Sequence, residues 1–132
     1  MFVSGNSNVF IIDPQLSGAP NSNAFLADAS FTGTASVFNP AGWAIRDTAV
    51  KVLGGTVNIN GGVFLECGKA GLLADGGNTT MSGVITVIRS LADIQATAKA
   101  KSICAFGNLP MKTPRFEVAA GVNKSGSDLA SK

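Results

Sequence analysis

The residues best suited to chemistry are four aspartates, each of which follows a short apolar run. They are Asp13, Asp28, Asp47 and Asp75. If these runs stack as strands, several carboxyl groups lie along one edge, and two carboxyls held about 5–10 Å apart can hydrolyse a glycosidic bond. Arg46 or Arg89 would stabilise the developing anion in a related lyase or esterase reaction. The structural interpretation is the stronger one, because an aspartate after a strand commonly accepts backbone N–H bonds in a turn.

Other reaction types are excluded by composition. The chain has no histidine, which removes Ser-His-Asp and Cys-His sites and the commonest zinc ligand. Cys67 and Cys104 are isolated, so we expect buried thiols rather than a metal site. Residues 62–69 fail as a phosphate loop, because five residues separate the glycines and Ala70 stands where Ser or Thr is needed. We therefore expect a non-enzymatic protein without a cofactor.

Length and charge indicate one small folded unit. The chain has 132 residues, of which 45% are apolar and 14% charged, with a net charge of +2, so it can form a core. No apolar run approaches the roughly 20 residues of a membrane helix. Basic residues concentrate in the last third of the chain. They either attract an acidic partner or only keep a protein with few charges soluble. Solubility is preferred, because no aromatic residues interleave those charges as nucleic-acid stacking would require.

Short β-branched or aromatic runs, spaced by roughly 8–12 residues with Gly, Asn, Pro or Ser between them, predict an all-β fold. Asn60-Gly61 marks either a two-residue hairpin or a tight corner between coils of a solenoid. Residues 6–13 recur imperfectly at 21–28, but no fixed period follows. One segment, 90–101, has the cap, charges and spacing of a short helix. We expect a β-rich body over residues 1–109 and an extended C-terminal arm over 110–132.

Residues 57–84 carry a resemblance. They include Asn60-Gly61-Gly62-Val63, Gly71-Leu72-Leu73 and Asp75-Gly76-Gly77-Asn78. This stretch resembles coils of the right-handed parallel β-helices of phage tailspikes and pectate-lyase-like proteins, over roughly residues 4–90. The wider composition is similar to that of small bacteriophage virion proteins. The resemblance implies a symmetric, often trimeric, non-enzymatic part that binds a capsid or tail. The helix and the basic tail are departures, and they keep an antiparallel sandwich or barrel as a competing architecture.

These observations predict a decoration, cement or spike subunit of a phage-like particle. It would be a homotrimer that binds a major capsid or tail protein, is made in the host cytoplasm without a signal peptide, and resides in the virion. The predicted interface residues lie in the terminal segments: Phe2, Lys112, Arg115, Phe116 and Val118. One alternative is a carbohydrate-binding or carbohydrate-cleaving β-helix fragment that uses the aspartates. The other is a nucleic-acid-associated basic module that uses Lys99, Lys101, Lys112, Arg115 and Lys124.

Overall fold

The structure is a computed structural model that describes residues 1–17, 23–105 and 116–125. These residues form strands and no helix. The strands are β1 (Phe2–Val3), β2 (Asn8–Ile12), β3 (Gln15–Ser17), β4 (Phe25–Ala27), β5 (Thr34–Phe38), β6 (Ala41–Trp43), β7 (Thr48–Val52), β8 (Thr56–Leu65), β9 (Ala70–Ala74), β10 (Asn78–Ile88), β11 (Ala92–Ala96), β12 (Ser102–Ala105), β13 (Phe116–Val118) and β14 (Asn123–Ser125).

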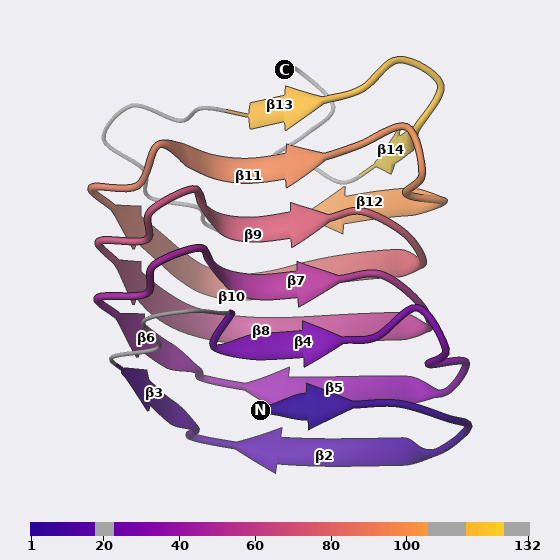
Figure 1. The fold of residues 1–132 in the computed structure, drawn as a ribbon, viewed down its shortest axis with the longest axis horizontal. Helices are drawn as coiled ribbons and strands as arrows, with labels where there is room; N and C mark the ends of the chain where they lie inside the picture. The colour runs from indigo at the N-terminus through magenta and orange to yellow at the C-terminus, as the bar shows by residue number, and fades with distance from the viewer. Residues whose placement is uncertain (18–22, 106–115, 126–132) are drawn as a thin grey trace.

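All strand pairs among the described residues are parallel, and the chain winds as a β-solenoid of about 5 turns (Figure 1). Face A stacks β1, β4, β7, β9, β11 and β13. Face B stacks β2, β5, the first halves of β8 and β10, β12 and β14. Face C stacks β3, β6 and the second halves of β8 and β10. The solenoid prediction is therefore confirmed, and the antiparallel sandwich or barrel is wrong.

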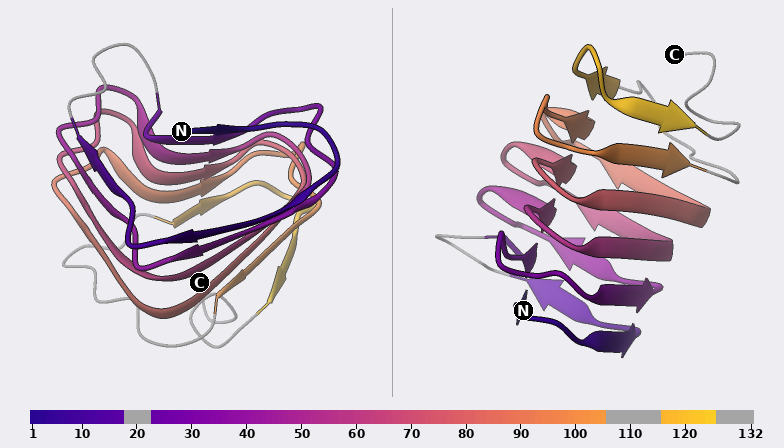
Figure 2. Two further views of the ribbon diagram at one scale, coloured as in Figure 1. Left: turned by 90° about the horizontal axis from the view of Figure 1, so that it is seen from below. Right: turned by 90° about the vertical axis from the view of Figure 1, so that its right-hand side faces the viewer.

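Successive coils keep a regular register. Thr34 pairs with Thr56, and Thr56 pairs with Asn78, so each of these two coils takes 22 residues. Viewed along the stack, the coils superimpose around a single interior (Figure 2). Each coil therefore contacts mainly the coil before it and the coil after it, as in other solenoids.

The interior is filled by columns of side chains, one from each coil. On face A the column runs through Phe25, Val50, Leu72 and Ile94, all of which are buried. Burying one such side chain stabilises the folded state by about 1.5–3 kcal/mol. Strand alternation sends the intervening residues outward, and these outward residues make the three surfaces of the molecule.

The corner between faces B and C is built from residues with left-handed backbones. Asp13, Asn39, Gly61 and Gly83 have φ angles of 49°, 50°, 66° and 73°. The register places them in one column, directly after paired residues of β2, β5, β8 and β10. Gly61 therefore turns a solenoid corner within β8, and the hairpin alternative at Asn60-Gly61 is wrong.

The helix predicted over 90–101 is also wrong. Ala92–Ala96 form β11, which pairs in parallel with β9 and stacks Ile94 on Leu72. The lysine-rich end of the segment forms a turn, in which the Ala100 N–H bonds to the Thr97 carbonyl at 3.0 Å. Burial of alternate residues against the coil below outweighs the local cap and charge pattern, since helix propensity is only a weak preference.

Part of the predicted C-terminal arm continues the solenoid. Within residues 110–132, β13 pairs with β11 and β14 pairs with β12. Residues 116–125 thus add a coil to the body. The rest of the predicted arm, including Lys112 and Arg115, lies outside the described residues.

Candidate functional sites: an apolar face and a turn groove

The four aspartates occupy three different places. Asp28 and Asp75 each directly follow strands of face A that share a register, and they stand two coils apart with Leu53 between them. Two coil steps separate their backbones by about 9–10 Å. Asp13 lies at the corner between faces B and C, and Asp47 precedes β7 at the opposite end of face A. The solenoid therefore aligns only two of the four carboxyl groups.

Those two carboxyl groups are held by neighbouring turn residues. Asp28 Oδ2 accepts hydrogen bonds from Ser30 Oγ at 2.7 Å and from Ser30 N at 3.2 Å. The Ser30 hydroxyl, assisted by backbone N–H bonds, lowers the pKa of Asp28 from its usual 3.8. Asp75 Oδ1 accepts a hydrogen bond from Thr97 Oγ1 at 2.5 Å across adjacent coils. Both carboxylates therefore have the turn partners expected of structural aspartates.

Arg89 and Cys67 also have structural roles, and Cys104, which was expected to be buried, is half-buried. Lys69 Nζ lies 3.3 Å from Asp47 Oδ1, and Arg89 pairs with Glu66 at 2.8 Å across adjacent coils. The Cys67 thiol is free and buried, and its burial raises its pKa. Within the described part of the chain, no group of three or more His, Cys, Asp or Glu is placed to hold a metal ion.

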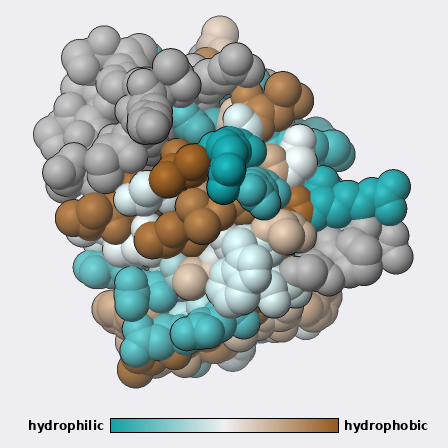
Figure 3. All heavy atoms as spheres, turned by 90° about the vertical axis from the view of Figure 1, so that its left-hand side faces the viewer, coloured by the Kyte–Doolittle hydropathy of each residue, from teal (hydrophilic) through white to brown (hydrophobic). Residues whose placement is uncertain are grey.

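Face C carries an outward band of apolar side chains. Trp43, Leu65 and Ile88 form one column because their strands pair in register. Val63 stands beside them, and the exposed fractions of Trp43, Val63 and Ile88 are 40%, 39% and 38%. Apolar side chains gather across the middle of this face in the space-filling view (Figure 3). We call Trp43, Val63, Leu65 and Ile88 the apolar band.

Face B shows that an outward column need not be apolar. Two of its outward columns in the central coils carry hydroxyl and amide groups, namely Thr34, Ser36, Thr56, Asn58, Asn78 and Thr80, whereas Phe38 at the end of β5 is 39% exposed. The polar side chains of these columns are half-buried. Because the same alternation rule produces both surfaces, the apolar band reflects the residues chosen at its positions rather than the architecture. Grouped exposed apolar side chains mark interaction sites more often than scattered ones do.

Two of the predicted interface residues, Phe2 and Val118, have described side chains, and both lie on face A, away from the apolar band. Phe2 is 60% exposed in β1, the first strand of face A, whereas Val118 is half-buried in β13, the last. Phe10 and Ile12, on the first coil of face B, are each 72% exposed and were not predicted as interface residues. The apolar band was missed as well, although the separation of 22 residues between Trp43 and Leu65 was available as a signal.

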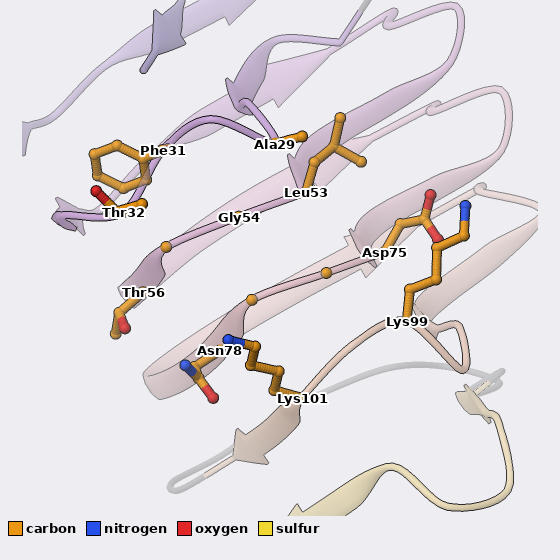
Figure 4. A pocket seen from close by; sticks show the side chains of 13 residues that line it. Ala29, Phe31, Thr32, Leu53, Gly54, Thr56, Asp75, Asn78, Lys99 and Lys101 are labelled. Atoms are coloured by element: carbon orange, nitrogen blue, oxygen red, sulfur yellow. The ribbon is translucent and has the colours of Figure 1, made fainter. Parts of the chain in front are cut away.

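A groove of about 670 Å³ lies at the turns between faces A and B (Figure 4). Its floor is formed by Gly54-Gly55 and Gly76-Gly77 on two adjacent coils. Longer turns of the coils on either side form its walls. The lining side chains are Ala29, Phe31, Thr32, Leu53, Thr56, Asp75, Asn78, Lys99 and Lys101. The groove thus joins one of the candidate aspartates to two of the basic residues considered for nucleic-acid binding.

Comparison with known proteins adds no relative: no family model, no curated protein and no solved structure matches the chain. Among the described residues there is also no helix long and apolar enough to cross a membrane.

Proposed function

We propose that this chain is a non-enzymatic structural protein of a phage-like particle, a decoration, cement or spike subunit that joins neighbouring proteins. The observation that carries the proposal is the apolar band on face C. Its side chains protrude from a stack of parallel strands whose columns are fixed by backbone hydrogen bonds. A stiff body with a fixed apolar surface is suited to shape-complementary assembly.

The first partner of the band is a second copy of this chain. Burying apolar surface contributes roughly 25 cal/mol per Å², and small β domains gain core by associating. A cyclic arrangement brings the same face of every copy toward one axis. A trimer packed along face C would remove the indole of Trp43 and the side chain of Ile88 from water while leaving both ends of the solenoid accessible. Those ends, including Phe2, Phe10 and Ile12, would then contact a major capsid or tail protein.

The sequence supports the particle setting through its composition. Only 14% of the residues are charged, against about 25% in ordinary soluble domains. Such a surface suits close packing against other proteins, because few charges must be desolvated. The carbohydrate alternative is less favoured, because Asp28 and Asp75 are each held by a turn hydroxyl.

The test is the mass of the full chain in solution at micromolar concentration, measured by sedimentation equilibrium. We expect the wild type to be a trimer and the double variant Trp43→Gln/Ile88→Thr to be a monomer, with unchanged far-UV circular dichroism. The matched control is Phe10→Thr/Ile12→Thr. It removes two apolar side chains of face B that are more exposed than Trp43 and Ile88, and it should leave the trimer intact.

A monomeric wild type, or a trimer that the face C variant leaves unchanged, would contradict the proposal. If only the control variant dissociated, the surface through which the copies associate would lie on the first coil and not on face C.

A further inference from the structure

We propose that the turn groove between faces A and B binds a phosphate-bearing ligand through Lys99 and Lys101. This inference is independent of the proposed assembly role, because the groove lies at a different corner from the apolar band. Figure 4 shows both lysines on one turn that lines the groove, with the side chain of Lys99 reaching toward Asp75 and that of Lys101 toward Asn78.

Differences in turn length create the groove. Between face A and face B, the two central coils turn through 53–55 and 75–77, each a single residue followed by two glycines. The coil before them uses 28–33 for the same turn, and the coil after them uses 97–101. Two short turns between two longer ones leave a hollow that is two coils wide at its floor.

Close stacking keeps the floor free of side chains. A Cβ atom on Gly76 would lie 2.0 Å from the carbonyl oxygen of Leu53, and one on Gly77 would lie 2.4 Å from that of Gly55. The glycines are therefore required by the solenoid itself. As a consequence, a ligand in the groove can approach the backbone closely.

The turn that carries the lysines is fixed by hydrogen bonds to its own residues and to the coil below. Lys101 N donates to the Gly77 carbonyl at 2.9 Å, and Lys99 N donates to Thr97 Oγ1 at 3.3 Å. The ion pairs Lys69–Asp47 and Arg89–Glu66 involve neither of these lysines. The backbone of both lysines is therefore anchored beside the groove, and their exposed side chains contribute to its lining.

The two lysines bring positive charge and hydrogen-bond donors to the groove. Each lysine brings three N–H donors and no acceptor. Asn78 Oδ1 already accepts a bond from Ser102 Oγ at 2.8 Å, which leaves the Asn78 Nδ2 group as a donor. Among the described residues of the lining, only Asp75 has a carboxylate, and its Oδ1 accepts the bond from Thr97. The charges of the two ammonium groups and the one carboxylate sum to a net positive charge. The groove therefore favours an anionic ligand that is rich in hydrogen-bond acceptors.

A phosphate group meets this description, because it combines negative charge with several strong acceptor oxygens, and lysine binds it as a point charge. The volume of about 670 Å³ lies within the usual range for small-ligand sites and has room for more than one phosphate group. Such groups come either from a free polyphosphate compound or from the backbone of a nucleic acid.

The test is calorimetric titration of the full chain with inorganic pyrophosphate at low ionic strength. We expect saturable binding that Lys99→Gln/Lys101→Gln weakens by at least about tenfold, since the variant removes both charged donors from the groove. The matched control, Lys51→Gln/Lys69→Gln, makes the same change in net charge away from the groove and should alter the affinity less than about twofold. Far-UV circular dichroism checks that both variants fold.

Absence of saturable pyrophosphate binding to the wild type would overturn the proposal, and so would an equal loss of affinity in the two double variants. Competition by a single-stranded oligonucleotide distinguishes the sources of phosphate once the site is established. Displacement of bound pyrophosphate by the oligonucleotide supports the groove as a phosphodiester site. Failure to displace it supports the groove as a site for a free phosphate compound.

Discussion

Asn39 donates a hydrogen bond from its side-chain Nδ2 to Oδ1 of Asp13 at 3.0 Å, and both residues have left-handed backbones. The pair begins the corner column that continues through Gly61 and Gly83 on the next two coils. Asn and Asp tolerate this conformation better than other non-glycine residues. The column therefore shows that a single backbone requirement is met by two residue chemistries along the stack.

Asn39→Val should destabilise the protein by about 1–2 kcal/mol, because a β-branched side chain is strained at positive φ. Asn39→Gly should be close to neutral, since glycine adopts this conformation freely and only an exposed hydrogen bond is lost. Urea unfolding followed by circular dichroism gives the free energies of unfolding. Asn58→Val, an outward position within β8, is the control and should change stability by less than about 0.5 kcal/mol. Equal effects at the two positions would contradict the conformational explanation.

Gly76→Ala should cost about 3 kcal/mol or more, because the new Cβ would meet the Leu53 carbonyl of the adjacent coil. Gly5→Ala separates this steric effect from a conformational one. Gly5 has a φ of +72° with nothing within 4 Å of an added Cβ, so its substitution should cost only about 1 kcal/mol. Thermal and urea unfolding of the two variants measure the difference. A Gly76→Ala variant as stable as Gly5→Ala would show that neighbouring coils can separate at this turn.

Thr79→Val should stabilise the protein by about 1 kcal/mol. Thr79 faces the interior between Val57 and Ile103, and its buried Oγ1 has no hydrogen-bond partner. Valine has nearly the same shape and removes the cost of burying an unpaired hydroxyl. Equilibrium unfolding in urea checks the sign. Thr80→Val, on the half-buried outward side of the same strand, is the control, and a loss of stability in Thr79→Val would disprove the explanation.

Ser30→Ala should make the stability of the protein fall less as the pH drops below 3.8, the ordinary pKa of an aspartate. The pKa of Asp28 is lowered from 3.8 in the folded state, chiefly by the Ser30 hydroxyl. A lowered carboxyl pKa contributes stability above the unfolded-state value, and this contribution is lost as the pH falls through the folded-state value. NMR titration of the Asp28 carboxyl should show its pKa closer to 3.8 in Ser30→Ala than in the wild type. An unchanged pKa would exclude Ser30 as the cause.

Much of the fold was predictable because local spacing determines which runs become strands. The short apolar runs and turn residues predicted an all-β chain, and a solenoid was one of the two architectures expected. The coil register was harder to obtain. The recurrence of 6–13 at 21–28 compares β2 of face B with β4 of face A, so it does not report the coil period. The better signal is the separation of 22 residues between Gly54-Gly55 and Gly76-Gly77.

The candidate sites depend on that register, which explains why sequence reasoning missed them. Trp43, Leu65 and Ile88 form a band only when their strands are stacked. The helix predicted over 90–101 failed for a related reason. Its Leu91, Ile94 and Ala98 suit a helical face, but Ile94 gains more by continuing the buried column above Leu72. Contacts between coils, rather than local preferences, determine both results.

The equivalence of Thr56 and Asn78 in successive coils makes the molecule extendable in fixed steps. A second copy of residues 56–77, inserted after the first, would stack on the original coil and carry the coil that begins at Asn78 in the register that the original has now. Each such insertion would lengthen the body by about 4.8 Å. The two ends of the solenoid would keep their own contacts but stand farther apart. The length of the solenoid can thus be changed in steps of one 22-residue coil.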